Sequence, residues 1–301
     1  MALSISAHTA LVGVLGDPVR HSLSPAMHNA ALQELGLDWV YLALPAPADQ
    51  LPQVVQALEA MDCRGLNVTL PHKQAVAPLC RELSPLAARV GAVNTLQRRE
   101  REGWLGTNTD VEGFLAPLRS GGRDWSGCRA VVLGCGGSAR AVVAGLVELG
   151  CRAILVAGRS SGSLLSFADG CRSWAPQLQV IPWTQLPGVL RESELVVNTT
   201  PVGMASPRDP GAAQASPLDP EALRALSPGS TVYDLIYTPR PSALLRASAA
   251  QGCRVIDGLE MLVQQGAAAL RLWTGQQTVP VDAMRQAAER CLAGEDGRGA
   301  A

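Results

Sequence analysis

A glycine-rich turn is the first part of the sequence whose residue types could do chemistry. The run Val131-Val132-Leu133-Gly134-Cys135-Gly136-Gly137-Ser138-Ala139 has the form G-x-G-x-x-A between a strand-like and a helix-like segment. Gly134 permits the tight turn, Gly136 lets a pyrophosphate approach the backbone, and Ala139 keeps the helix near the sheet. Free N–H groups at the helix start attract the anion. An ordinary turn between strand and helix is the alternative, because glycine also serves such turns.

The end of the next expected strand indicates which dinucleotide is bound. An NAD site places an acidic residue about 20 residues after the glycines, where it holds the ribose 2′-hydroxyl. This chain has Val156-Ala157-Gly158-Arg159-Ser160-Ser161 there, with no acid nearby. Arg159 could pair with a 2′-phosphate and Ser160 could add a hydroxyl, although Arg159 could also be a surface side chain. The missing acid favours NADP in either case.

Two serines near the N-terminus could bind a carboxylate. Ser24 precedes Pro25, the arrangement of a helix N-cap followed by proline at the first helical position. With Ser22 it would present two hydroxyls beside the positive end of a helix. A structural cap alone explains Ser24 equally well.

A lysine follows the apolar strand that contains Asn67. In Asn67-Val68-Thr69-Leu70-Pro71-His72-Lys73 we expect a helix to begin at Pro71, with Lys73 in its first turn. The helix dipole would disfavour an ammonium there, which suits a group that exchanges protons. A surface lysine is the alternative. The clusters Gly91–Thr95 and Gly106–Asp110 read by themselves as turns, and Asp257–Gln265 as the start of an amphipathic helix.

Strand-like and helix-like segments alternate along nearly the whole chain, which predicts an α/β fold of parallel sheets with crossover helices. The first series has expected strands at 11–15, 40–44, 65–70 and 92–98, helices at 25–35 and 51–61, and a polar connector at 103–110. The second has strands at 130–133, 153–157, 178–182, 195–198, 231–236 and 255–256, with a helix at 138–149. Helices at 259–273 and 281–292 and a frayed tail at 293–301 close the chain.

Composition narrows the class of protein. At 301 residues, with 47% hydrophobic and 17% charged residues, the chain can build two domain cores. A net charge of −1 gives no general nucleic-acid footprint, no apolar run is long enough for a membrane span, and the first residues lack the basic region that precedes the apolar stretch of a signal peptide, so we expect neither. The eight cysteines form no C-x-x-C pair and the four histidines no H-E-x-x-H, so we expect reduced thiols in the cytoplasm and no metal site.

Taken together, these clusters resemble the shikimate dehydrogenase family. G-D-P-V-x-H-S-L-S-P-x-M-H-N, N-V-T-x-P-x-K, G-A-V-N-T, G-x-N-T-D, the glycine turn and G-L-x-M-L-V-x-Q occur in the family's order. The resemblance implies two α/β domains: a substrate-binding, catalytic domain from 1–110 and 258–301, and a Rossmann-type NADP-binding domain at 111–257. It also implies the NADPH-dependent reduction of 3-dehydroshikimate to shikimate, in chorismate and aromatic amino-acid biosynthesis.

The resemblance further implies roles for individual residues. Lys73 and Asp110 would be the catalytic pair. The substrate would be bound by Ser22 and Ser24 at its carboxylate and, around the ring, by Asn67, Thr69, Lys73, Asn94, Asp110, Tyr237 and Gln265. The cofactor would contact Gly134, Gly136, Gly137, Ser138, Ala139, Arg159, Ser160, Asn198, Thr199, Met204 and Gly258. This chain departs from the family in one respect. Family members that use NADP often have Asn-Arg-Thr followed soon after by a second basic residue, whereas this chain has Gly158-Arg159-Ser160 and no second arginine in the run that ends at Ser163. We therefore expect NADP with reduced discrimination.

Three other functions remain open at this stage. A quinate/shikimate dehydrogenase with broader cofactor use is the nearest. A folate-linked methylene dehydrogenase shares the architecture but has no evident use for paired serines, and a catalytically silent dinucleotide-binding regulator would not need Lys73 and Asp110. The expected partner is a small-molecule substrate, with no nucleic acid or membrane, and the protein is expected to be a monomer or homodimer.

Overall fold

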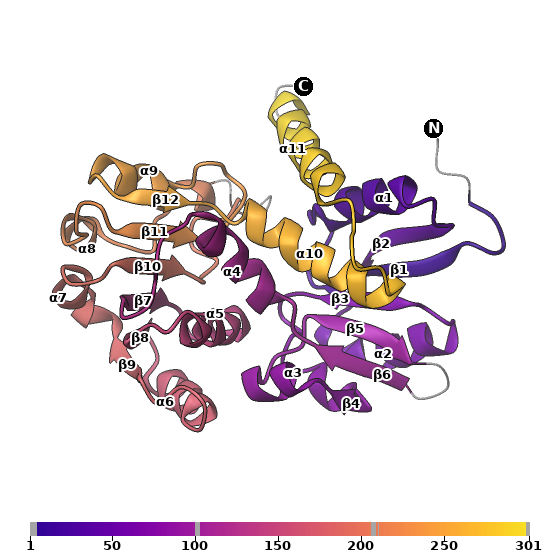
Figure 1. Ribbon diagram of the computed structural model, residues 1–301, viewed down its shortest axis with the longest axis horizontal. Coiled ribbons are helices and arrows are strands. Elements are labelled where there is room, and N and C mark those ends of the chain that lie inside the picture. Colours follow the sequence, from indigo (N-terminus) through magenta and orange to yellow (C-terminus); the bar gives the residue numbers. More distant parts are fainter. Residues whose placement is uncertain (1–4, 100–102, 206–208, 210, 299–301) are drawn as a thin grey trace. The chain divides into compact units, whose positions relative to one another are not determined.

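The chain folds as two compact units, one from residues 1–113 with 262–301 and the other from 114–261. In this computed structural model the described residues are 5–99, 103–205, 209 and 211–298, with side chains as far as Gly294. Figure 1 shows the two sheets and their helices coloured along the sequence. No described helix has both the length and the apolar composition that crossing a lipid bilayer requires.

Unit 1 is built around a mixed sheet with the strand order β2-β1-β3-β5-β6-β4. Its elements are β1 (Ala10–Gly16), α1 (Ser24–Glu34), β2 (Trp39–Pro45), η1 (Ala48–Gln50), α2 (Leu51–Ala60), β3 (Gly65–Val68), η2 (Ala77–Leu79), β4 (Glu82–Leu83), α3 (Pro85–Val90), β5 (Thr95–Arg99), β6 (Gly103–Thr107), α10 (Leu259–Thr274) and α11 (Val281–Arg298). The helix α4 (Asp110–Ser120) leads from this unit into the second.

The parallel arrangement expected for the first three strands is confirmed, but the sheet as a whole is mixed. Strands β1, β2 and β3 are parallel, but β5 runs antiparallel to β3 and to β6. The expected connector at 103–110 contains β6, in which Trp104 and Gly106 are buried while their neighbours are partly exposed. A hairpin-like return between β5 and β6 needs no crossover helix, so the alternation of strands and helices does not reveal it.

The C-terminal helices pack on unit 1. The indole of Trp273 in α10 lies against Gly65 of β3, where a Cβ would approach the ring to 2.2 Å. Its Nε1 donates to the Leu96 carbonyl at 3.0 Å. Helix α11 lies against α1 and extends to Arg298, so the expected fraying from 293 is wrong for the described residues. Positions 299–301 of that expected tail lie outside them.

Unit 2 has a six-stranded sheet that is parallel throughout, with the order β12-β11-β10-β7-β8-β9. Its elements are β7 (Arg129–Leu133), α5 (Gly137–Glu148), β8 (Ala153–Gly158), α6 (Ser161–Cys171), β9 (Leu178–Pro182), η3 (Trp183–Gln185), α7 (Leu186–Leu190), β10 (Leu195–Asn198), η4 (Ala212–Gln214), α8 (Pro220–Arg224), β11 (Thr231–Asp234), α9 (Ala243–Ala250) and β12 (Arg254–Ile256). Counted from β7, this is the order 3-2-1-4-5-6 of dinucleotide-binding sheets.

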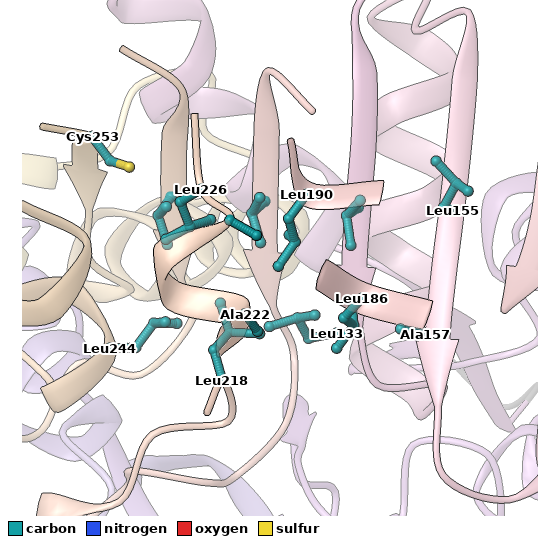
Figure 2. Packing of buried hydrophobic residues seen from close by; sticks show 14 of the residues in the cluster. Leu133, Leu155, Ala157, Leu186, Leu190, Leu218, Ala222, Leu226, Leu244 and Cys253 are labelled. Atoms are coloured by element: carbon teal, nitrogen blue, oxygen red, sulfur yellow. The ribbon is translucent and has the colours of Figure 1, made fainter. Parts of the chain in front are cut away.

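A continuous apolar core covers one face of the unit 2 sheet. Figure 2 shows Leu186 and Leu190 of α7 and Ala222 of α8 packed near Leu133 of β7. These side chains are almost completely buried. Close packing of this kind fixes the strand ends from which the loops of the candidate site project.

Candidate active site

An ion pair between Lys73 and Asp110 lies among the polar groups of unit 1. Lys73 Nζ is 2.6 Å from Asp110 Oδ2, and the two side chains are only 12% and 6% exposed. Asp110 is the first residue of α4, where a carboxylate complements the positive end of the helix. The lysine therefore has a fixed position, little contact with water and a proton available for transfer.

Lys73 does not lie in a helix as expected. Residues 70–76 form turns, followed only by the short helix Ala77–Leu79, so the prediction of a helix beginning at Pro71 is wrong. The helix-dipole argument does not apply to Lys73. The backbone of Lys73 is held instead by a hydrogen bond from the N–H of Val93 to the Lys73 carbonyl, at 2.7 Å.

Asn94 joins the ion pair to its surroundings. Its Nδ2 donates to Asp110 Oδ1 at 2.9 Å, to Thr109 Oγ1 at 3.0 Å and to Gln265 Oε1 at 3.3 Å. Its Oδ1 accepts from the N–H of Thr109 at 2.7 Å. All four residues are buried, and Gln265 comes from α10, far along the chain. The structure thus brings Lys73, Asp110, Asn94 and Gln265 together, and adds Thr109, which the sequence prediction left out.

The antiparallel strands explain this convergence. Asn94 immediately precedes β5, and Asp110 follows the end of β6. Because β5 runs opposite to both neighbours, its beginning lies beside their ends. The N–H of Val68 donates to the Asn94 carbonyl at 2.7 Å, and the N–H of Asn94 donates to the Thr107 carbonyl at 3.1 Å.

Asn67 extends the same network toward β2. Its Nδ2 donates to Thr95 Oγ1 at 3.2 Å, and its Oδ1 accepts from the hydroxyl of Tyr41 at 2.8 Å. Tyr41 is completely buried, its ring is stacked on His28 with centroids 4.2 Å apart, and burial raises its pKa well above the usual value. The phenol is therefore a protonated donor. Sequence reasoning missed Tyr41 because a tyrosine within a strand has the pattern of an ordinary core residue.

The two serines lie at the start of α1. Leu23 occupies the N-cap position with helical backbone angles and Ser24 is the first helical residue, so the prediction of a Ser24 cap is wrong. The N–H of Ser24 donates to Ser22 Oγ at 3.2 Å, and the Ser24 side chain lowers the pKa of Tyr41 against the larger effect of burial. Ser24 is thereby linked through Tyr41 to Asn67.

Thr69 follows β3 and packs closely on the end of β1. A Cβ at Gly16 would lie 2.5 Å from Thr69 Cγ2, so glycine is needed there for the two strand ends to meet. The N–H of Thr69 donates to the Leu15 carbonyl at 2.9 Å. Thr69 is thus fixed at the edge of the sheet where Asn67 and Lys73 lie.

In unit 2 the glycine turn joins β7 to α5. Gly134 has φ +100°, and a Cβ there would come within 2.9 Å of Thr199 Oγ1, so both conformation and space require glycine. A Cβ at Gly136 would meet nothing within 4 Å, which leaves the helix start open to a ligand. Gly137 begins α5, Ser138 follows, and Ala139 is fully buried. These residues fit a pyrophosphate.

The end of β8 carries the residues expected at the ribose. Arg159 is exposed, and Ser160 is the N-cap of α6, its Oγ accepting from the N–H of Ser163 at 3.3 Å. A Cβ at Gly158 would lie 2.8 Å from Leu164 Cδ2. Gly158 stands where family members that use NADP often have asparagine, and the absence of a side chain there lets α6 pack closely on the end of β8.

Asn198 is the last residue of β10, and Thr199 follows it beside the glycine turn. Thr199 Oγ1 donates to the Leu133 carbonyl at 2.7 Å. Asn198 Nδ2 donates to Asp234 Oδ1 at 2.9 Å, and burial raises the pKa of Asp234. Strands β7 and β10 are neighbours whose crossovers lead in opposite directions, which is where dinucleotides bind in such sheets.

The remaining predicted residues also lie in unit 2. Met204 is 45% exposed after β10, and Tyr237 is half-buried after β11. A Cβ at Gly258 would come within 2.0 Å of the Leu235 carbonyl oxygen, so backbone packing alone requires this glycine. Among the described residues, no three His, Cys, Asp or Glu side chains gather as they would around a metal ion.

The strand order of unit 2, its glycine turn and the buried lysine–carboxylate pair of unit 1 define a dinucleotide-dependent dehydrogenase. Models of the shikimate dehydrogenase substrate-binding domain and of the shikimate 5′-dehydrogenase C-terminal domain match residues 14–96 and 258–289. A shikimate dehydrogenase (NADP(+)) from Synechocystis sp. is 53% identical over 289 residues, which are 94% of this chain and 96% of the relative. The chain therefore belongs to the shikimate dehydrogenase family.

Solved structures agree with this assignment. The shikimate 5-dehydrogenase of Thermus thermophilus, in complex with NADP(H) and shikimate, is 38% identical with a TM-score of 0.82, covering 94% of this chain and all (100%) of that one. The shikimate 5-dehydrogenase of Listeria monocytogenes, in complex with shikimate and NAD, is 33% identical with a TM-score of 0.82, covering 95% and 98%. The α/β fold and the oxidoreductase class are confirmed by these relatives.

Proposed function

We propose that the protein catalyses the reversible NADPH-dependent reduction of 3-dehydroshikimate to shikimate, within chorismate and aromatic amino-acid biosynthesis. The observation that carries the proposal is the buried Lys73–Asp110 pair, held by Asn94 at the sheet edge of a chain closely related to shikimate dehydrogenases. The Thermus neighbour, which holds shikimate and NADP(H), supports the choice of both ligands.

Unit 1 would bind the substrate and unit 2 the cofactor, in line with the predicted limits of 1–110 with 258–301 and of 111–257. NADPH supplies the hydride. The Lys73 ammonium gives a proton to the carbonyl oxygen as it becomes a hydroxyl, and takes it back in the reverse direction. Asp110 Oδ2 holds that ammonium in place, while Asp110 Oδ1 is occupied by Asn94.

The other polar groups would orient the ring. Ser22 and Ser24 are suited to the carboxylate because both hydroxyls lie at the start of α1. The ring hydroxyls would be bound by Asn67, Thr69, Asn94, Asp110 and Gln265, and Tyr237 stays a predicted substrate ligand. Asn67 Nδ2 donates to Thr95, and Asn67 Oδ1, which already accepts from Tyr41, has a second lone pair that would accept a hydrogen bond from a ligand hydroxyl.

For the cofactor, Gly134, Gly136, Gly137, Ser138 and Ala139 would hold the pyrophosphate, and Arg159 and Ser160 the 2′-phosphate. Asn198, Thr199, Met204 and Gly258 would lie near the nicotinamide half. A quinate/shikimate dehydrogenase with broader cofactor use is the second candidate. It is favoured by one observation, that β8 is followed by a lone arginine, and the Listeria neighbour holds NAD.

We propose the cytoplasm as the site of action, supported by eight free thiols in the structure. A monomer or a homodimer would serve the reaction, with small molecules rather than nucleic acid or membrane as partners.

Replacing Lys73 by Ala tests the proposed chemistry. We expect kcat to fall by at least about 100-fold with a smaller change in KM, the range that a general acid–base group supplies. The unaltered protein assayed with shikimate and with quinate, each with NADP and NAD, is the reference. An unchanged kcat in Lys73→Ala would remove Lys73 from the chemistry, and faster turnover of quinate or equal use of NAD would favour the second candidate.

A further inference from the structure

Two cysteines of unit 2 lie in sulfur-to-sulfur contact. Cys128 immediately precedes β7, and Cys151 lies two residues before β8. Their Sγ atoms are 3.2 Å apart, and the residues are 5% and 2% exposed. Because β7 and β8 are parallel neighbours, their beginnings lie side by side and bring the two side chains together.

The backbone holds this pair from both sides. The N–H of Arg152 donates to the Cys128 carbonyl at 3.0 Å, and the N–H of Gly127 donates to the Gly150 carbonyl at 3.0 Å. The N–H of Cys128 also donates to the Trp125 carbonyl at 3.1 Å. The contact is therefore a consequence of the strand pairing and of the turn before β7, not of one adjustable side chain.

The surroundings make the two thiols chemically different. The hydrogen bond from Cys151, with smaller contributions from Arg123 and Arg152, lowers the pKa of Cys128 despite burial and the opposing charge of Glu194. The same hydrogen bond and burial raise the pKa of Cys151. A thiol of lowered pKa beside a thiol of raised pKa is the arrangement in which the first sulfur attacks and the second resolves.

No other two cysteine sulfurs are in contact within the part of the chain that the structure describes. Cys171, for example, is completely buried in the same unit, and burial raises its pKa. Its sulfur lacks a second thiol nearby among the described residues, so Cys171 offers a matched control of equal burial.

We propose that Cys128 and Cys151 are a redox modification site, at which a low-molecular-weight disulfide such as glutathione disulfide forms a reversible intramolecular disulfide. The Cys128 thiolate attacks one sulfur of glutathione disulfide, forming a mixed disulfide and releasing one glutathione thiolate. The Cys151 thiol gives its proton to that glutathione thiolate and attacks the Cys128 sulfur, which releases the second glutathione as a thiolate that takes a proton from water. Two protein thiols are oxidised and one glutathione disulfide is reduced to two thiols, so atoms and electrons balance.

The bond would join two cysteines 23 positions apart and close a loop that contains β7, the glycine turn and α5. Restricting that loop in the unfolded chain stabilises the folded unit. For a unit of this size we expect the melting temperature of unit 2 to rise by about 5–10 °C on oxidation and to return on reduction. Mass and melting are both independent of which reaction the enzyme catalyses.

The experiment exposes the folded, reduced protein to glutathione disulfide and to diamide, blocks remaining thiols, and maps the peptides by mass spectrometry. We expect a peptide pair linked through Cys128 and Cys151, a mass loss of about 2 Da for the thiol pair, and reversal by dithiothreitol. Cys128→Ser and Cys151→Ser should each abolish the link, whereas Cys171→Ser should leave it intact.

Three results would overturn the proposal: no linked peptide in the unaltered protein under either oxidant, a stable glutathione adduct at Cys128 that Cys151 never displaces, or a disulfide in the unaltered protein that joins either cysteine to a different partner. The peptide map of the unaltered protein decides the matter even where a serine variant fails to fold.

Discussion

Tyr41 and Tyr233 allow the same substitution to be compared in two different settings. Both rings are completely buried, and each is stacked on another ring, Tyr41 on His28 and Tyr233 on Phe114. The hydroxyl of Tyr41 donates to Asn67 Oδ1 at 2.8 Å, whereas that of Tyr233 has no hydrogen-bond partner among the described residues. Replacement by phenylalanine removes one oxygen from each and leaves the ring in place.

The expected costs differ because of what remains behind. Tyr41→Phe leaves the buried Asn67 oxygen without its donor, and a buried group that loses its partner costs roughly 1–3 kcal/mol. We expect a loss of about 2–3 kcal/mol in the stability of unit 1, or about 4–10 °C in melting temperature. Tyr233→Phe removes a hydroxyl that is already unsatisfied, so we expect between no change and about 1 kcal/mol of stabilisation.

Calorimetry and urea unfolding of the two variants measure this contrast. The reasoning is refuted if Tyr233→Phe is destabilised as strongly as Tyr41→Phe. It is also refuted if Tyr41→Phe has the same melting temperature as the unaltered protein. The first result would mean that ring packing, not the hydrogen bond, decides both effects.

Three further predictions concern the cofactor and pH. Gly136→Ala should raise KM for NADP at least about 10-fold by placing a methyl where the pyrophosphate approaches; its melting should stay unchanged because that methyl meets nothing within 4 Å. Gly188→Ala, equally open but far along the sequence from the glycine turn, is the control and should leave KM for NADP unchanged. Arg159→Met should lower the preference for NADP over NAD, measured as a ratio of kcat/KM, by about 10-fold; an unchanged ratio would place the phosphate elsewhere. Burial lowers the pKa of His28 from 6.5 to about 3, so the unfolded chain binds the extra proton and stability falls with acidification across that interval; the slope, up to about 1.4 kcal/mol per pH unit, should be absent in His28→Phe, and an equal slope in both would contradict it.

Much of the fold could be predicted from the sequence, because the spacing of apolar residues along the chain indicates which side chains are buried. Strands such as β1, β7 and β10 are apolar runs of strand length, and their ends lie within one or two residues of the expected ones. Strand β6 was missed because its two glycines and short length have the composition of a connector. The direction of β5 could not be read at all, since pairing direction depends on partners that the local sequence does not name.

The sequence predicted which residues belong to the candidate site, but not how the fold brings them together. The polar clusters at strand ends pointed to Lys73, Asn94 and Asp110, but only the antiparallel pairing of β5 explains why they meet. The helix expected to begin at Pro71 does not form: residues 70–76 are turns. Tyr41 carried no signal in the sequence, since its role depends on the buried Asn67 opposite.

The most direct test of the central claim is the absorbance of NADPH formed when the purified protein is mixed with shikimate and NADP. The account predicts steady turnover that is lost by at least about 100-fold in Lys73→Ala. It also predicts less turnover with quinate. Because Arg159 is the one basic residue directly after β8, it predicts a measurable but smaller rate with NAD than with NADP. The absence of NADPH formation from shikimate in the folded, unaltered protein would contradict it.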